Sequence, residues 1–227
     1  MHKLTQLIHK ATMEKKIAIE AALTNAANEN EKALEIIRAA KNTVVEQGVS
    51  EVRTEEVKRE DGIYLVYDDG TYMPFSGNEP KDNVRGIGIV YDGHAFQVAL
   101  EDLGEWPLVR DYKKCPEESP FYKTECEGLH DWDFESATEH IKEIGTDIPL
   151  PDGWHIPTLA VLEVMCFWKD AINKALVYAG GEEMPDEGHW SSTEGYRSHA
   201  RSVYFSNGVA YYNGKCISSV VRPVAAF

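Results

Sequence analysis

The dipeptide Asn207-Gly208 lies between two segments of alternating character, residues 201–206 and 209–213. Asn-Gly in this setting is among the strongest short signals for a β-hairpin, because both residues readily adopt the positive φ angles of a two-residue turn. Successive strand residues point to opposite sides, so we expect Val203 and Phe205 to face the core. The C-terminal region is therefore predicted to be built around a paired β-ribbon.

Upstream of this hairpin the sequence indicates strands first and helices afterwards. Two further hairpins are indicated by Asp-Gly turns, and three helices by apolar residues at helical spacing with capping residues at their ends. The expected elements are strands 63–67 and 71–75, strands 86–91 and 95–100, a loop at 104–132, a helix from Phe134 between Asp133 and Gly145, a helix from Thr158 through Cys166, a short helix from Asp170 to Gly180-Gly181, and strands 189–192 and 219–226. This order predicts an α+β domain over residues 49–227 with a mainly antiparallel sheet.

Residues 1–48 form a separate segment in this interpretation. Residues 3–47 contain no Pro or Gly and are rich in Ala, Glu, Lys and Leu, which predicts a helix that stops at Gly48. A 4-3 spacing runs along it through Leu23, Ala27, Asn30, Leu34, Ile37, Lys41 and Val44. Two uses of this helix remain open: self-association into a homo-oligomer, or docking on a neighbouring protein.

The formal net charge of −15 is unevenly distributed along the chain. All 38 Asp and Glu residues lie in residues 1–194, whereas residues 195–227 contain none and carry the cations Arg197, Arg201, Lys215 and Arg222. So acidic a chain is not expected to bind nucleic acid. The absence of Asp and Glu from residues 195–227 has two interpretations. Either carboxylates are scarce there as they are in strands generally, or this surface is under a different selection from the rest of the chain.

The sequence shows neither a membrane-spanning segment nor a signal that would direct the chain to a membrane. It has no apolar run of about 18 residues, so no membrane insertion is expected. The start, MHKLTQLIHKATMEKK, lacks the apolar core of a secretory signal and a lipid-attachment cysteine. We therefore expect synthesis in the cytoplasm without a signal peptide.

Neither catalysis nor a metal centre is indicated, and no cofactor is expected. The sequence has no Gly-rich phosphate loop, no HExxH and no Gly-x-Ser-x-Gly. His189 is interpreted as a hydrogen-bonded strand residue rather than a base. Of the four cysteines, Cys166 is expected to be a buried thiol, and Cys115 and Cys126 could pair under oxidising conditions. With His130 they offer only three zinc ligands, one fewer than a structural site needs.

Two motifs in the C-terminal half carry more specific information. Gly-Trp-His-Ile-Pro-Thr at 153–158 leads into the second helix, and Trp-Ser-Ser-Thr-Glu follows at 190–194. The chain then continues through Phe-Ser-Asn-Gly at 205–208 and closes with Val-Arg-Pro-Val-Ala-Ala-Phe. In this order the motifs resemble the formylglycine-generating-enzyme type of the C-type-lectin-like fold. Within it, the chain resembles the variable proteins that diversity-generating retroelements diversify, which include phage tail-tip receptor-binding proteins.

The resemblance covers roughly residues 86–227 and is firmest over 150–227. It implies a ligand-binding display protein, and it favours a phage virion as the place of action, in the tail or a tail fibre. The sequence departs from two functional classes of this fold. Formylglycine-generating enzymes use two cysteines near the C-terminus, and only Cys216 is present here. Calcium-dependent lectins use Glu-Pro-Asn and Trp-Asn-Asp, whereas here Glu79-Pro80 precedes Lys81 and Trp190 precedes Ser191. Neither formylglycine chemistry nor calcium-mediated sugar binding is therefore implied.

Retroelement diversification has a compositional consequence that the sequence can be checked against. In the resembled proteins, mutagenesis at adenines produces codons that do not encode Lys, Glu, Gln, Met or Trp. These five types supply 53 of the 227 residues, so a stretch as long as 195–220 would hold about six of them. It holds one, Lys215. Strand composition accounts for part of this deficit.

These arguments place the expected variable, ligand-binding face at residues 195–220. Tyr and Ser dominate its outward positions, and they suit recognition because Tyr offers large rigid contact area and Ser adaptable hydrogen bonds. The candidate binding residues are Tyr196, Arg197, Ser198, His199, Arg201, Ser202, Tyr204, Val209, Tyr211, Tyr212, Gly214, Cys216, Ile217, Ser219 and Val220. We expect a non-enzymatic, adhesin-like protein that binds a cell-surface protein or glycan. The alternatives are tyrosines that bind nothing, and a catalytic or structural member of the same fold family without a variable face.

Overall fold

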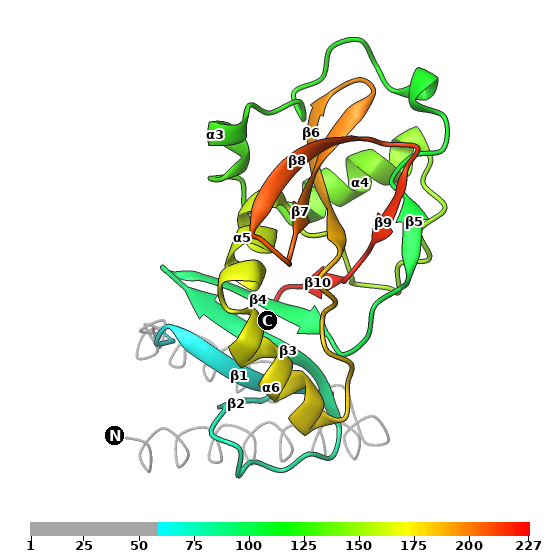
Figure 1. Ribbon diagram of the computed structural model, residues 1–227. Coiled ribbons are helices and arrows are strands. Elements are labelled where there is room, and N and C mark those ends of the chain that lie inside the picture. The colour runs from blue at the N-terminus through cyan, green and yellow to red at the C-terminus, as the bar shows by residue number, and fades with distance from the viewer. Residues whose placement is uncertain (1–58) are drawn as a thin grey trace, which may run out of the picture. The chain divides into compact units, whose positions relative to one another are not determined.

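Residues 59–227, which the computed structural model describes, fold into two five-stranded sheets with helices packed against them (Figure 1). The sheets are mostly antiparallel, so the expected α+β class is confirmed. The expected helix at 3–47, with its Leu23–Val44 spacing, lies outside the described residues. Within the described part, no helix is long and apolar enough to cross a membrane.

The first sheet is made by the two predicted N-terminal hairpins and a strand from the C-terminus. Its strands are β10 (Val224–Ala225), β4 (His94–Ala99), β3 (Val84–Tyr91), β1 (Gly62–Tyr67) and β2 (Tyr72–Pro74), in that spatial order. Asp92 and Gly93 alone connect β3 to β4, and their φ angles are 48° and 81°. Positive φ at both residues is what a two-residue hairpin turn requires, so this turn is confirmed as predicted.

The helices are α4 (Phe134–Ile144), α5 (Leu159–Phe167), α6 (Lys169–Ala179) and the short α3 (Glu125–Gly128). The Asp133 side chain accepts a hydrogen bond from the Ser136 amide at 2.9 Å, and Gly145 ends α4 in the left-handed conformation. Both caps were predicted, as were the start of α5 after Thr158 and the end of α6 at Gly180. The N-cap of α6 is Trp168 rather than the predicted Asp170, since α6 begins directly after α5.

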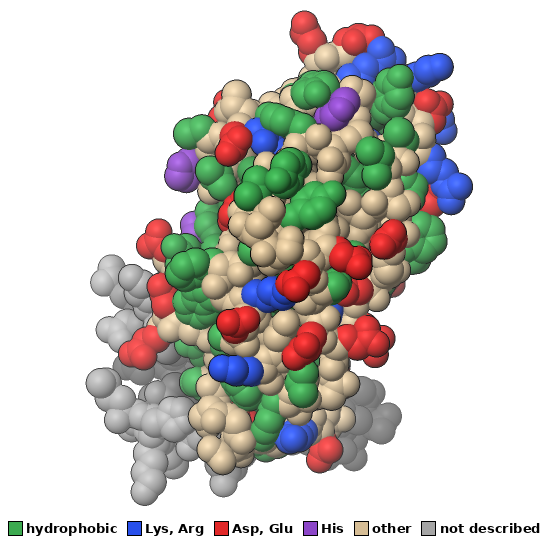
Figure 2. Space-filling model, in the orientation of Figure 1, with side chains coloured by type: hydrophobic (Ala, Val, Ile, Leu, Met, Phe, Trp, Pro, Cys, Tyr) green, Lys and Arg blue, Asp and Glu red, His purple; other side chains and the backbone are tan. Residues whose placement is uncertain are grey.

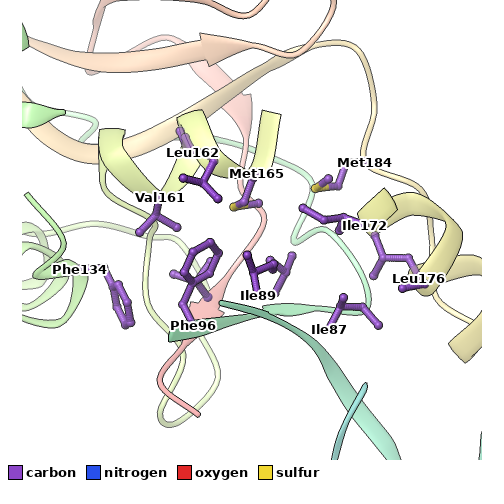
Figure 3. Close-up of a cluster of buried hydrophobic side chains, with 14 of the residues drawn as sticks. Ile87, Ile89, Phe96, Phe134, Val161, Leu162, Met165, Ile172, Leu176 and Met184 are labelled. Atoms are coloured by element: carbon purple, nitrogen blue, oxygen red, sulfur yellow. The ribbon is translucent and has the colours of Figure 1, made fainter. Parts of the chain in front are cut away.

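The main core lies between one face of the first sheet and two helices. In Figure 3, Ile87, Ile89 and Phe96 of the sheet point toward Val161, Leu162 and Met165 of α5 and toward Ile172 and Leu176 of α6. Val203 and Phe205 belong to the same buried cluster, as the alternation predicted. This core therefore fixes the turn end of the C-terminal hairpin. Trp154 of the 153–158 motif is only partly buried, and so is the Cys166 thiol, which was expected to be buried.

The second sheet carries the candidate binding segment. Its order is β5 (Glu105–Pro107), β9 (Ser218–Val220), β6 (Gly188–Tyr196), β7 (His199–Tyr204) and β8 (Val209–Gly214). The pairings are antiparallel except that β6 runs parallel to β9. β8 is an edge strand, and in the described part of the chain no strand pairs with its outer side.

Three predictions about this region need correction. The predicted strand 219–226 is two strands in different sheets, β9 and β10, with Pro223 between them. The predicted loop at 104–132 contains β5, α3 and a 3₁₀ turn at Tyr112–Lys114. The 207–208 hairpin is confirmed, but its connection is the four residues 205–208, because the buried Phe205 leaves the ladder and its amide donates to the Glu187 carbonyl.

The two sequence motifs are hydrogen-bonded to each other. The hydroxyl of Ser192 donates to the Ile156 carbonyl at 3.1 Å, and the hydroxyl of Thr193 accepts from the Leu159 amide at 2.9 Å. Trp190 is fully buried, and its indole nitrogen donates to the Trp106 carbonyl at 2.8 Å. The motifs thus fasten β6 to the start of α5, which holds the β7–β8 hairpin on a rigid support.

Candidate ligand-binding face

The exposed tyrosines of the C-terminal segment lie on the β7–β8 hairpin and the end of β6. Tyr196, Tyr204, Tyr211 and Tyr212 have exposed fractions of 46%, 36%, 44% and 40%. All four were among the candidate binding residues, and alternation placed Tyr204 and Tyr211 outward; the structure has all four exposed. In Figure 2, hydrophobic side chains gather over the position of β8, and acidic side chains gather mainly below them.

The tyrosines form two clusters rather than one continuous face. Neighbouring residues of β8 point to opposite faces of the sheet, and side chains on both faces of this strand reach solvent. The Tyr204 cluster consists of Tyr204, Tyr211 and Val209, with the two rings edge to face at 5.2 Å between centroids. The Tyr212 cluster consists of Tyr196, His199 and Tyr212. The centroid of the Tyr196 ring lies 4.7 Å from that of His199 and 5.7 Å from that of Tyr212. A ligand at this edge would meet aromatic rings on either side of β8.

Four candidate residues expected in the binding face are buried. Ser202 is fully buried because β7 is flanked by β6 and β8, and its hydroxyl accepts from the Asn213 side chain at 2.7 Å. Arg201 is 3% exposed and lies under the Tyr212 ring. Ser219 and Val220 are buried in β9 between β5 and β6. These four residues support the face and do not form its surface.

The remaining candidates differ in how far solvent reaches them. Cys216 and Ile217, in the turn after β8, are exposed. The partly buried candidates are Arg197, Ser198, His199 and Gly214. The exposed part of the segment is therefore the tyrosine clusters and the 216–217 turn.

Every cation of the carboxylate-free tail is paired with an acidic residue from outside it. Arg201 lies 3.2 Å from Glu125. The other pairs are Arg197 with Glu117, Lys215 with Glu194, and Arg222 with Asp102. The excess of four positive charges in residues 195–227 is thus neutralised locally. What the hairpin presents to a ligand is aromatic and nearly uncharged, a property that the sequence alone did not reveal.

A buried polar cluster lies at the base of the hairpin. Lys215 and Glu194 are fully buried and form an ion pair. The Lys215 ammonium also donates to the Cys115 sulfur at 3.5 Å, and His140 Nε2 lies 3.0 Å from the second Glu194 oxygen. Burial raises the pKa of the Cys115 thiol above its ordinary value, although the Lys215 charge opposes this. Burial and the Glu194 charge raise the pKa of the neighbouring Tyr122 to about 12.

The sequence did not predict this cluster. The sequence left open a pairing of Cys115 with Cys126 under oxidising conditions; in the structure Cys115 is buried beside Lys215, Cys126 is exposed on α3, and neither is in a disulfide. Lys215 and Glu194 could be assigned to one site only once the β8–β9 turn was placed against β6. The one available signal was Lys215 itself, the single lysine in an otherwise depleted segment.

The other titratable side chains of the described part form no group of metal ligands. Within residues 59–227, no three His, Cys, Asp or Glu side chains converge as metal ligands would. His189 is a buried strand residue that stacks on Phe205 with 4.0 Å between ring centroids. Burial lowers the pKa of His189 to about 4. The packing around His189 therefore favours the neutral imidazole.

Comparisons with known proteins identify one structural neighbour and no sequence family. No family model matches the chain, and no curated protein matches it. The crystal structure of a fimbrial protein from Bacteroides ovatus ATCC 8483 is similar, with a TM-score of 0.53 and 17% sequence identity. The match covers 74% of this chain, which spans only 49% of the length of that protein. At this identity the likeness concerns the fold.

Proposed function

We propose that the chain is a ligand-binding protein of the C-type-lectin-like class whose contact surface is the β7–β8 hairpin and the 216–217 turn. The observation that carries the proposal is four exposed tyrosines on the β7–β8 hairpin and the adjoining end of β6, where the neighbouring cations are paired. Exposed aromatic side chains on a rigid scaffold supply contact area at low entropic cost. The ligand we propose is a protein or glycan on a cell surface.

We further propose that the exposed residues of 195–220 vary between copies of the gene through a diversity-generating retroelement. Lys215 supports this proposal. It is the only residue in that segment of a type that adenine mutagenesis does not produce, and it is fully buried in an ion pair with Glu194. A fixed lysine is therefore expected where the scaffold needs one, amid positions that are free to change.

A second candidate role is structural, and the fimbrial neighbour favours it. An assembly protein would use the open edge of β8 for pairing with another strand, because an edge strand without Lys or Pro invites strand addition. In both roles we place the protein at a surface, in a fimbria-like or phage-tail setting. The two roles differ in whether the exposed tyrosines or the edge backbone make the contact.

Gene sequencing from many isolates tests the variable-face proposal. We expect substitutions to concentrate at exposed positions such as Tyr204, Tyr211 and Ile217, while Lys215 and Ser202 stay constant. A template repeat and a reverse transcriptase gene next to this gene are also expected. Substitutions spread evenly over residues 59–227 would contradict a variable face.

Binding is tested with the labelled full chain on intact bacterial cells and on an array of bacterial surface glycans. The double variant Tyr204→Ser/Tyr211→Ser should lose about tenfold or more in retention, as expected for paired aromatic hot spots. Phe167→Ser is the matched control, since Phe167 is an 80% exposed aromatic residue on α5. Equal retention of the two variants would favour the structural role.

A further inference from the structure

The buried cluster of Cys115, Lys215 and Glu194 brings together groups that the proposed binding function does not use. A thiol, an amine and a carboxylate meet there, and their residues are 2%, 0% and 0% exposed. The Lys215 nitrogen is the centre of the group, donating both to the Glu194 carboxylate and to the Cys115 sulfur, the latter at 3.5 Å. The amine and thiol are therefore held in contact by packing.

The surroundings restrict how these groups move and what reaches them. The Lys215 amide donates to the Ser198 carbonyl, and its own carbonyl accepts from the Val109 amide, each at 3.0 Å. The Arg197 side chain donates to the Cys115 carbonyl at 3.1 Å. Backbone on both sides of the sulfur–nitrogen contact is thus fixed, and a bulky oxidant or alkylating reagent has no direct path to a thiol that is 2% exposed.

We propose that Cys115 and Lys215 form a redox-dependent covalent cross-link, in which one oxygen atom bridges the cysteine sulfur and the lysine nitrogen. The oxidant is dioxygen, a small apolar molecule suited to entering a packed interior. Glu194 is a positioning residue that accepts a proton from the Lys215 ammonium, so that the nitrogen lone pair becomes available.

The atoms and electrons of this step balance. The thiol S–H bond and one amine N–H bond break, and S–O and N–O bonds form to the same oxygen atom. The second oxygen atom leaves as water with the two released hydrogens. Sulfur and nitrogen each give up two electrons, and dioxygen takes up all four. A thiol reductant reverses the link, as it reverses other low oxidation states of cysteine.

The cross-link would join two segments 100 residues apart in sequence. It would tie the segment that follows β5 to the turn between β8 and β9, directly after the last residue of the proposed binding hairpin. A covalent bond over so long a separation restricts the unfolded chain and should raise the thermal midpoint. This inference is independent of the proposed ligand binding, because neither Cys115 nor Lys215 contributes exposed surface.

The test uses the full chain with the other three cysteines replaced, Cys126→Ser/Cys166→Ser/Cys216→Ser, so that disulfides cannot form. After exposure to air, intact mass should increase by about 14 Da, one oxygen gained and two hydrogens lost, and dithiothreitol should reverse it. Digestion should yield a peptide pair joined at Cys115 and Lys215, and the oxidised protein should melt higher than the reduced one. Adding Cys115→Ser should abolish the mass increase, the joined peptide pair and the rise in melting temperature.

Each other result would overturn the proposal. An unchanged mass in air means that the cluster is an ion pair and nothing more. A gain of about 16 Da without a joined peptide means a sulfenic acid on Cys115 alone. A loss of about 2 Da with a joined peptide means a direct sulfur–nitrogen bond instead of an oxygen bridge.

Discussion

The Tyr212 ring covers the guanidinium of Arg201, whose central carbon lies 3.4 Å from the ring centroid. The same guanidinium is 3.2 Å from the Glu125 carboxylate of α3. The ring also packs against Gly195, where an added Cβ would lie 2.0 Å from it. Tyr212 therefore supports the fold as well as presenting an exposed edge, whereas Tyr211, on the other side of β8, is available to the proposed ligand.

Replacement of the two adjacent tyrosines should separate these roles. Tyr212→Ala should lower the free energy of unfolding by about 2 kcal/mol, because it uncovers a desolvated cation–π contact. Tyr211→Ala should cost less than about 1 kcal/mol, since exposed sites usually tolerate change. Urea denaturation of both variants measures the difference. Equal destabilisation would mean that the Tyr212–Arg201 contact adds nothing.

Phe205 should be the most sensitive position of the hairpin connection. It is 5% exposed and stacks on His189 within the main core. Phe205→Ala should cost about 3–5 kcal/mol, as truncation of a buried aromatic residue does. The control is Ser206→Ala at the next position, which is exposed and should change stability by less than about 0.5 kcal/mol. A loss near 1 kcal/mol for Phe205→Ala would show that the connection is loosely packed.

Stability should fall between pH 6.5 and pH 4 because of His189. Its pKa is lowered to about 4 by burial, while in the unfolded chain it is near 6.5. Below pH 6.5 the unfolded state therefore binds a proton that the folded state refuses, which destabilises the fold by roughly 3 kcal/mol by the time pH 4 is reached. His189→Gln should have a flatter dependence in this window, measured by denaturation at several pH values. Parallel curves for the two proteins would contradict the assignment.

Ligand binding through the hairpin should depend weakly on salt. The four cations of the tail are paired with Glu117, Glu125, Glu194 and Asp102, so little unpaired charge is left to be screened. The dissociation constant should change less than about threefold between low and high ionic strength. A steep decline of affinity with salt would indicate that the ligand contacts charges elsewhere on the protein.

The N-terminal segment should assemble copies of the chain if its heptad-like spacing is used for self-association. Light scattering of the full chain is compared with that of a chain that begins near Gly48. A multiple of the chain mass that falls to one chain on truncation supports self-association. If both proteins contain the same number of chains per particle, docking on another protein remains as the use of the helix predicted there.

Local signals predicted most of the individual elements. Asp92-Gly93 specified its turn because positive φ at two residues is a local requirement, and Asp133 and Gly145 marked the ends of α4 for a similar reason. The short α3 was missed although its signal was present: Thr124 and Glu127 make a reciprocal capping box. Its brevity and the surrounding Gly and Pro obscured the signal.

What the sequence did not reveal depends on non-local packing. Alternation alone makes Ser202 an outward residue, but it is buried because β7 is an inner strand and small side chains there are covered by their neighbours. Alternation also does not tell an edge strand from an inner one, so it did not show that Tyr211 and Tyr212 are both exposed. The charge pairing of the tail required the partners from 102–125 and 194 to be placed in space.

The division of the C-terminal stretch between two sheets has a mechanical consequence. A ligand that pulls on the β7–β8 hairpin loads the chain through β9, which is hydrogen-bonded to β5, and then through β10, which is hydrogen-bonded to β4. Tension that passes from β8 toward the C-terminus thus meets two hydrogen-bonded ladders in succession, one in each sheet. Pulling this C-terminal segment out of the fold would require both ladders to break, which would suit the proposed role of holding a ligand under load.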